Sequence, residues 1–118
     1  MSADELRELD RSPFDLIVDV PRGVLVARDW SLDLARRRTL LSLLAVLLAS
    51  PNHVLPADML VERAWGEAYH PVRYHSRLTM AVTRLRRLLA GRLELEGTRE
   101  GYRANFSGRA LVIEPASQ

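Results

Sequence analysis

Residues 73–90 carry the strongest structural signal in the sequence, because their apolar residues recur every three or four positions and fall on one stripe of a helix. The stripe consists of Leu78, Val82, Leu85 and Leu89. The opposite side carries Arg73, Ser76, Arg77, Met80, Thr83, Arg84 and Arg87. No acidic residue occurs between positions 73 and 92. A helical face with several arginines and no acid repels itself, and phosphate groups are its natural counter-charge.

Two further helices are predicted upstream of this one. Residues 36–49 are leucine-rich and end at Ser50-Pro51-Asn52, and their apolar residues cover most of the helix circumference. Residues 56–65 begin with a proline, which suits a first turn, and end at Gly66. A loop over residues 67–71 then leads to the third helix.

β-Rich segments lie on both sides of the helices. The predicted strands cover residues 15–20, 24–27 and 30–34 before them, 93–95 and 102–106 after them, and a further strand over 111–113. The first three form an antiparallel sheet, and the next two form a hairpin. The sequence therefore predicts an α+β winged helix-turn-helix with an N-terminal antiparallel sheet, a three-helix core and a C-terminal β-hairpin wing.

The 118 residues fit one domain, and a domain of this size buries a core without disulfides or metals. We expect a flexible N-terminal segment over residues 1–13, the winged-helix domain over 14–113 and a tail over 114–118.

Charge is distributed unevenly along the chain. All 17 basic residues are arginines. Residues 1–34 carry four arginines against eight acids, whereas residues 72–109 carry nine arginines against three acids. This polarity predicts that one end of the domain contacts a polyanion.

Several functional classes are excluded by what the sequence lacks. Without cysteine there is no disulfide scaffold, thiolate nucleophile or cysteine-ligated metal. The longest apolar run, residues 40–49, is too short to cross a membrane, and the acidic N-terminus is unlike a signal peptide, so we expect a cytoplasmic protein without membrane contact. The histidines at 70 and 75 suit no common metal motif. We predict no enzyme, no cofactor and no metal.

Three fragments of the sequence together resemble a known family. They are LVERAWGE at residues 60–67, VTRLRRLL at 82–89 and GYR at 101–103. In this order and at these spacings they resemble the effector domain of OmpR/PhoB-type winged-helix response regulators, whose patterns read approximately LLERVWGE, ISRLRRKL and GxGYR. The resemblance covers residues 14–106. Bacterial regulators that carry a similar domain at the front of a longer chain, such as antibiotic-pathway activators, are a second match.

The resemblance implies sequence-specific binding of double-stranded DNA in bacterial transcription regulation, with helix 73–90 in the major groove and a wing, 93–106, on the backbone or minor groove. Facing the bases would be Arg77, Met80, Thr83, Arg84 and Arg87. Near the DNA backbone would be Arg73, Arg86, Thr98, Arg99 and Arg103. The loop that contacts RNA polymerase in such activators corresponds to residues 66–74, with Glu67, Tyr69 and His70. Members commonly form homodimers on tandem half-sites, which is the expectation here too.

The sequence departs from the family pattern in both DNA-binding elements. Thr79 and Ala81 stand where the family often has an Asp or Asn and a His, and Arg99 lies one residue late in the wing turn and is followed by Glu100. The receiver domain of the family has no counterpart in the 118 residues. The chain is therefore expected to be either a piece of a longer regulator or a stand-alone regulator with another input.

Two other interpretations remain open. The arginine-rich face is also consistent with a solvated surface that keeps the protein soluble. The wing glutamates, Glu94, Glu96 and Glu100, favour a winged-helix protein-interaction module that has lost DNA binding.

Overall fold

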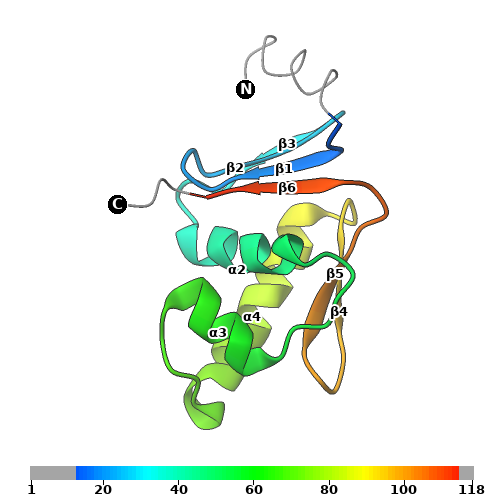
Figure 1. Cartoon of the computed structure of the whole chain (residues 1–118). Helices are drawn as coiled ribbons and strands as arrows, with labels where there is room; N and C mark the ends of the chain where they lie inside the picture. The colour runs from blue at the N-terminus through cyan, green and yellow to red at the C-terminus, as the bar shows by residue number, and fades with distance from the viewer. Residues whose placement is uncertain (1–12, 115–118) are drawn as a thin grey trace.

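In the computed structural model, which describes residues 13–114, a β-sheet, three helices and a β-hairpin are arranged in layers (Figure 1). The sheet lies on one side of helix α2 (Arg38–Ala49). Helices α3 (Ala57–Trp65) and α4 (Pro71–Leu89) lie on the other side of α2, with the hairpin beside them (Figure 1). This is the α+β winged helix-turn-helix that the sequence predicts. Of the predicted N-terminal segment, 1–13, and the predicted tail, 114–118, residues 1–12 and 115–118 lie outside the described residues.

The sheet has four strands in the order β3-β2-β1-β6. Strands β1 (Leu16–Asp19), β2 (Val24–Ala27) and β3 (Ser31–Asp33) form the predicted antiparallel meander. Strand β6 (Ala110–Ile113) adds to the free edge of β1 in parallel orientation. The sequence predicts this strand but not its place beside β1, because that pairing joins the two ends of the domain.

Asp15 fixes the junction between β1 and β6. Its carboxylate accepts hydrogen bonds from the backbone N–H of Arg109 at 2.9 Å and from the guanidinium of Arg28 at 3.0 Å. The backbone bond to Arg109 and then the bond from Arg28 hold the pKa of Asp15 below its ordinary value of 3.8.

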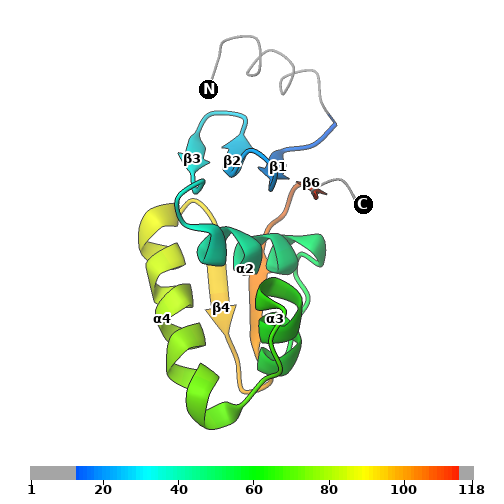
Figure 2. The same ribbon diagram turned by 90° about the vertical axis from the view of Figure 1, so that its left-hand side faces the viewer.

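Helix α2 (Arg38–Ala49) lies between the sheet and the other two helices (Figure 2). Seven of its twelve residues are buried, and its leucines pack on both neighbouring layers. This explains why its apolar residues occupy most of its circumference. The helix begins at residue 38, two residues later than predicted.

Helix α3 (Ala57–Trp65) and helix α4 (Pro71–Leu89) complete the helical core. Gly66 ends α3 with a left-handed φ of 66°. Helix α4 begins two residues before the predicted start because Pro71 occupies its first turn, where the absent N–H costs nothing. None of the helices within residues 13–114 is long and apolar enough to span a membrane.

The hairpin consists of β4 (Glu94–Gly97) and β5 (Tyr102–Asn105) and is tied to the helical core along its length. Tyr102 exchanges two backbone hydrogen bonds with Leu55, at 2.8 and 3.1 Å. Just after β5, the Asn52 side-chain amide donates a hydrogen bond to the Phe106 carbonyl and accepts one from the Phe106 N–H. These bonds hold β5 against the segment that connects α2 to α3.

Gly101 allows the close approach at Leu55. Its φ is +152°, and a Cβ atom placed there would lie 2.0 Å from the Leu55 carbonyl oxygen. No residue with a side chain fits this position without moving the wing.

Candidate nucleic-acid interface

Helix α4 divides into a buried side and an exposed side, as its periodicity predicts. The four stripe residues, Leu78, Val82, Leu85 and Leu89, are buried in the core. Tyr74 and Ala81 are buried as well, which extends the buried side toward α3 beyond the predicted stripe. All seven residues predicted on the opposite side are exposed. The outer surface of α4 is therefore a continuous, solvent-facing strip.

Two arginines on this strip have no partner in the described part of the chain. The side chains of Arg84 and Arg87 form no hydrogen bond and no ion pair with any residue of the range 13–114. They are three residues apart on one helical face, so their like charges cost about 0.2–0.5 kcal/mol in helix stability. An external anion would relieve this repulsion.

Between the arginines the strip presents small and apolar groups. The Met80 side chain is 52% exposed. The hydroxyl of Thr83 donates to the Thr79 carbonyl at 2.9 Å, and that of Thr79 donates to the His75 carbonyl at the same distance. With its hydroxyl proton engaged, Thr83 offers its methyl group and an oxygen acceptor to a ligand. Such groups suit a thymine methyl or a base amino group.

Arg77 differs from the other arginines of the strip because its guanidinium is already occupied. It lies 4.5 Å from the ring centroid of Trp65 and 3.3 Å from the Glu67 carboxylate. Its side chain is 45% exposed, and a half-exposed ion pair and a cation–π contact of this kind together contribute about 1 kcal/mol. Arg77 is thus held at the side of α4 that faces α3.

Arg86 lies on the other side of α4 and bonds to the wing. Its Nε and one terminal nitrogen donate to the Leu95 carbonyl at 2.9 and 2.8 Å. The predicted contact of Arg86 with the DNA backbone stays a prediction, but these two donors hold β4 against α4.

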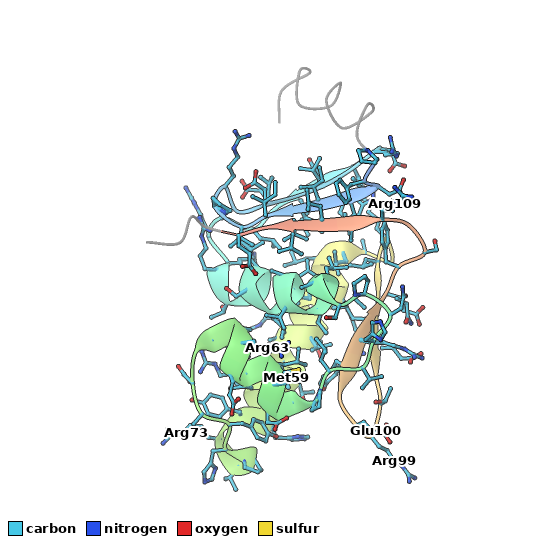
Figure 3. The ribbon with its side chains drawn as sticks, viewed as in Figure 1. Met59, Arg63, Arg73, Arg99, Glu100 and Arg109 are labelled. Atoms are coloured by element: carbon cyan, nitrogen blue, oxygen red, sulfur yellow. The ribbon has the colours of Figure 1, made fainter. Side chains whose placement is uncertain are left out.

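The wing places its remaining predicted residues at its tip and along β5. The Thr98 hydroxyl accepts from the backbone N–H groups of Glu100 and Gly101, each at 3.2 Å, and so shapes the turn. Arg99 and Glu100 project from the tip, at the end of the domain where Arg73 also lies (Figure 3). Arg103 pairs with Glu96 across the hairpin, and its Nε is buried without a hydrogen-bond partner among the described residues. Of the two arginines described on the wing, only Arg99 presents an uncommitted guanidinium.

The loop between α3 and α4 contains the three residues predicted to contact RNA polymerase. Glu67 accepts a hydrogen bond from the Tyr74 hydroxyl, which raises the pKa of Tyr74 above its ordinary value of 10.0. The Tyr69 ring lies 6.3 Å from that of Tyr74. His70 is exposed and occupies the N-cap position of α4. The loop is therefore packed against the first turn of α4 rather than extended from it.

Two features near the start of α4 are not predicted from the sequence. Val72 is 86% exposed, and it escapes prediction because the predicted helix begins at residue 73. A groove runs between α4 and the wing tip, lined on the helix side by His75 and Thr79 and on the wing side by Thr98, Arg99 and Glu100. The proline at position 71 is the available signal for the earlier helix start.

Comparisons with known proteins agree with this geometry. The profile of the family described as "Transcriptional regulatory protein, C terminal" matches residues 32–103. The crystal structure of the DNA-binding domain of CpxR from E. coli superposes with a TM-score of 0.64 at 20% sequence identity, and the match covers 82% of this chain and 96% of that one. Among curated protein sequences, none matches the chain.

Proposed function

We propose that this chain, which belongs to the OmpR/PhoB-type family of C-terminal domains of transcriptional regulatory proteins, binds double-stranded DNA sequence-specifically through α4. The family consists of bacterial-type DNA-binding domains and is not enzymatic, so DNA binding in transcription regulation follows from membership. The finer proposal is that α4 enters the major groove and the wing lies on the backbone or minor groove.

The observation that carries this proposal is the exposed outer strip of α4. Arg84 and Arg87 have no partner among residues 13–114, and Met80 and Thr83 lie exposed beside them. An arginine can donate two parallel hydrogen bonds to guanine, while the other two side chains suit thymine methyl groups. We therefore assign base contacts to these four residues. The fifth predicted base reader, Arg77, differs from them because Glu67 and Trp65 already hold its guanidinium.

The backbone contacts fall into two groups in this proposal. Arg73 and Arg99 lie exposed at the same end of the domain and contact phosphates directly (Figure 3). Arg86, Thr98 and Arg103 hold the wing in place through bonds to α4 and within the hairpin, and they approach the DNA backbone from that position. The domain is proposed to act in the bacterial cytoplasm, where its target DNA lies.

Selection of binding sites from random duplexes tests the proposal. The unaltered protein is expected to enrich one motif, and tandem repeats in that motif would report a homodimer on two half-sites. Arg84→Ala should then lose about 1–3 kcal/mol of discrimination at one base position. Arg109→Ala is the matched control, because it removes one arginine from the sheet end of the domain and not from α4 (Figure 3). An equal loss on every duplex would remove Arg84 from base readout.

A different class of function, a protein-interaction module, is favoured by the three glutamates of the wing. Titration against random duplex at low salt separates the two functions, since DNA binding through arginines is strongest there. No binding under these conditions would contradict the DNA proposal.

RNA polymerase is proposed as a second partner, which would bind the loop that holds Tyr69 and His70. The test is whether substitution of these two residues abolishes activated transcription while the affinity for DNA stays unchanged.

A further inference from the structure

Four side chains form a cluster that joins α3, the following loop and the start of α4. The Glu67 carboxylate accepts hydrogen bonds from the Tyr74 hydroxyl and from Arg77, the latter at 3.3 Å. The Arg77 guanidinium lies 4.5 Å from the Trp65 ring centroid and 5.7 Å from that of Tyr74. One acid and two rings therefore surround a single arginine.

The cluster is anchored to the core on both sides. Trp65 donates its ring N–H to the Thr39 carbonyl at 3.0 Å, which fixes the indole against α2. Tyr74 is only 5% exposed. Glu67 and Arg77 are the half-exposed members, so they are the ones that can rearrange.

Arg77 also lines a shallow groove that lies away from the wing. Its other lining residues are Arg38, Thr39 and Ser42 of α2, Ala64 and Trp65 of α3, and Glu67. The arginine therefore points toward α2 and α3, whereas Arg84 and Arg87 are not among the residues that line this groove. An arginine in this position adds nothing to the charge of the outer strip unless its bond to Glu67 breaks.

We propose that Glu67 is a positioning residue that holds Arg77 against α3 and away from DNA, and that it thereby lowers the affinity of the domain for duplexes of arbitrary sequence. Arg77 is then not a base reader in the bound state. Non-specific affinity depends on the number of phosphates neutralised, so withholding one arginine widens the gap between specific and non-specific binding. The inference rests on the proposed DNA binding.

The test measures the salt dependence of binding to a random-sequence duplex and to the selected duplex. Each phosphate contact contributes about −0.9 to the log–log slope. Arg77→Ala should leave the slope of the unaltered protein unchanged. Glu67→Gln, which keeps the shape but removes the charge, should steepen the slope by about 0.9 and tighten random-duplex binding about three- to ten-fold. The variant that combines Glu67→Gln with Arg77→Ala should have the salt-dependence slope of the unaltered protein.

Glu62→Gln is the matched control, because Glu62 is an exposed acid of α3 and is not the carboxylate that bonds Arg77. Removing it changes net charge equally, so a slope change shared by both glutamine variants would be a general charge effect and would overturn the inference. A slope that is shallower by about 0.9 in Arg77→Ala would overturn the inference too, since Arg77 would then already contact a phosphate in the unaltered protein.

A second measurement needs no DNA. The Trp65 ring should shift the Arg77 Nε–H proton resonance in the unaltered protein, and Glu67→Gln should reduce that shift. An unchanged resonance would overturn the positioning role. These measurements also distinguish failure of this inference from failure of the proposed DNA binding. If DNA binding fails, the unaltered protein will bind no duplex at low salt, while the Arg77 resonance will still respond to Glu67→Gln.

Discussion

Helix α4 and the wing have opposite electrostatic designs, although both are the elements expected to contact DNA. Residues 71–89 contain five arginines and no acid, whereas residues 93–106 contain two arginines and three glutamates. On the outer strip of α4, Arg84 and Arg87 have no partner within residues 13–114. On the wing, Arg103 pairs with Glu96. Under the proposed function, α4 would therefore supply most of the attraction for DNA, and the wing would contribute mainly by its position.

The two elements also differ in how they are held. Helix α4 is fixed by its buried apolar side, so its outer residues are available to a ligand. The strands of the wing bury only Leu95 of β4 and Ala104 of β5 in the same core, and directed polar contacts from Tyr102 to Leu55 and from Arg86 to Leu95 add to the wing's hold. Changes in the wing should therefore alter stability more than DNA affinity, and changes on the outer strip should do the reverse.

The largest effect is expected from Gly101→Ala. The new Cβ atom would lie 2.0 Å from the Leu55 carbonyl oxygen and would force β5 away from α3. We expect the free energy of unfolding to fall by about 2–4 kcal/mol, measured by denaturant titration. Gly91→Ala is the control, because Gly91 also has a positive φ, of +81°, but a Cβ atom added there would meet no described atom within 4 Å. It should lose only about 1 kcal/mol, and equal losses would show that the contact at Leu55 is unimportant.

Neighbouring arginines of α4 give a direct contrast. Arg86→Ala removes two hydrogen bonds to the Leu95 carbonyl and should lower the free energy of unfolding by about 1–2 kcal/mol. Arg87→Ala should change stability by less than about 0.5 kcal/mol but weaken DNA binding. Unfolding and duplex titrations of both variants check this. A loss of stability in Arg87→Ala as large as that in Arg86→Ala would contradict this expectation.

The smallest expected effect is a change in the titration of Tyr74, which lies on the side of α4 that faces the loop after α3. The Tyr74 hydroxyl donates to Glu67, which raises the pKa of Tyr74, so the stability it adds is complete below pH 10.0 and is lost as pH rises through the higher folded pKa. Subtracting the absorbance titration of Tyr74→Phe from that of the unaltered protein isolates this tyrosine. Its midpoint should lie above 10.0 and fall toward that value in Glu67→Gln. A midpoint that does not respond would separate Glu67 from Tyr74.

Local periodicity explains which parts of the fold are predictable from the sequence. The buried stripe of α4 repeats every three or four residues, and this spacing alone places Leu78 and Leu85 inside and Arg84 and Arg87 outside. The wing follows from alternation and turn residues. The matched range of the family profile, residues 32–103, contains all three fragments that carry the family resemblance.

Features that depend on distant contacts are not predictable in the same way. Strand β6 pairs with β1 from the other end of the domain, and no local pattern specifies its parallel orientation. Arg77 projects among the outer residues in a helical wheel, yet Trp65 and Glu67 draw it toward α3. The same holds for Arg86, whose partner on β4 becomes a neighbour only when the hairpin folds back.

The most direct test of the contrast between α4 and the wing compares two variants that each remove two arginines. One is Arg84→Ala with Arg87→Ala, and the other is Arg99→Ala with Arg103→Ala. Affinity for the selected duplex is measured at several salt concentrations, after unfolding has shown that both variants are folded. We predict a loss of about 2–4 kcal/mol with altered base preference for the helix variant, and less than about 1 kcal/mol with unaltered preference for the wing variant. Equal losses, or a larger loss for the wing variant, would contradict the account.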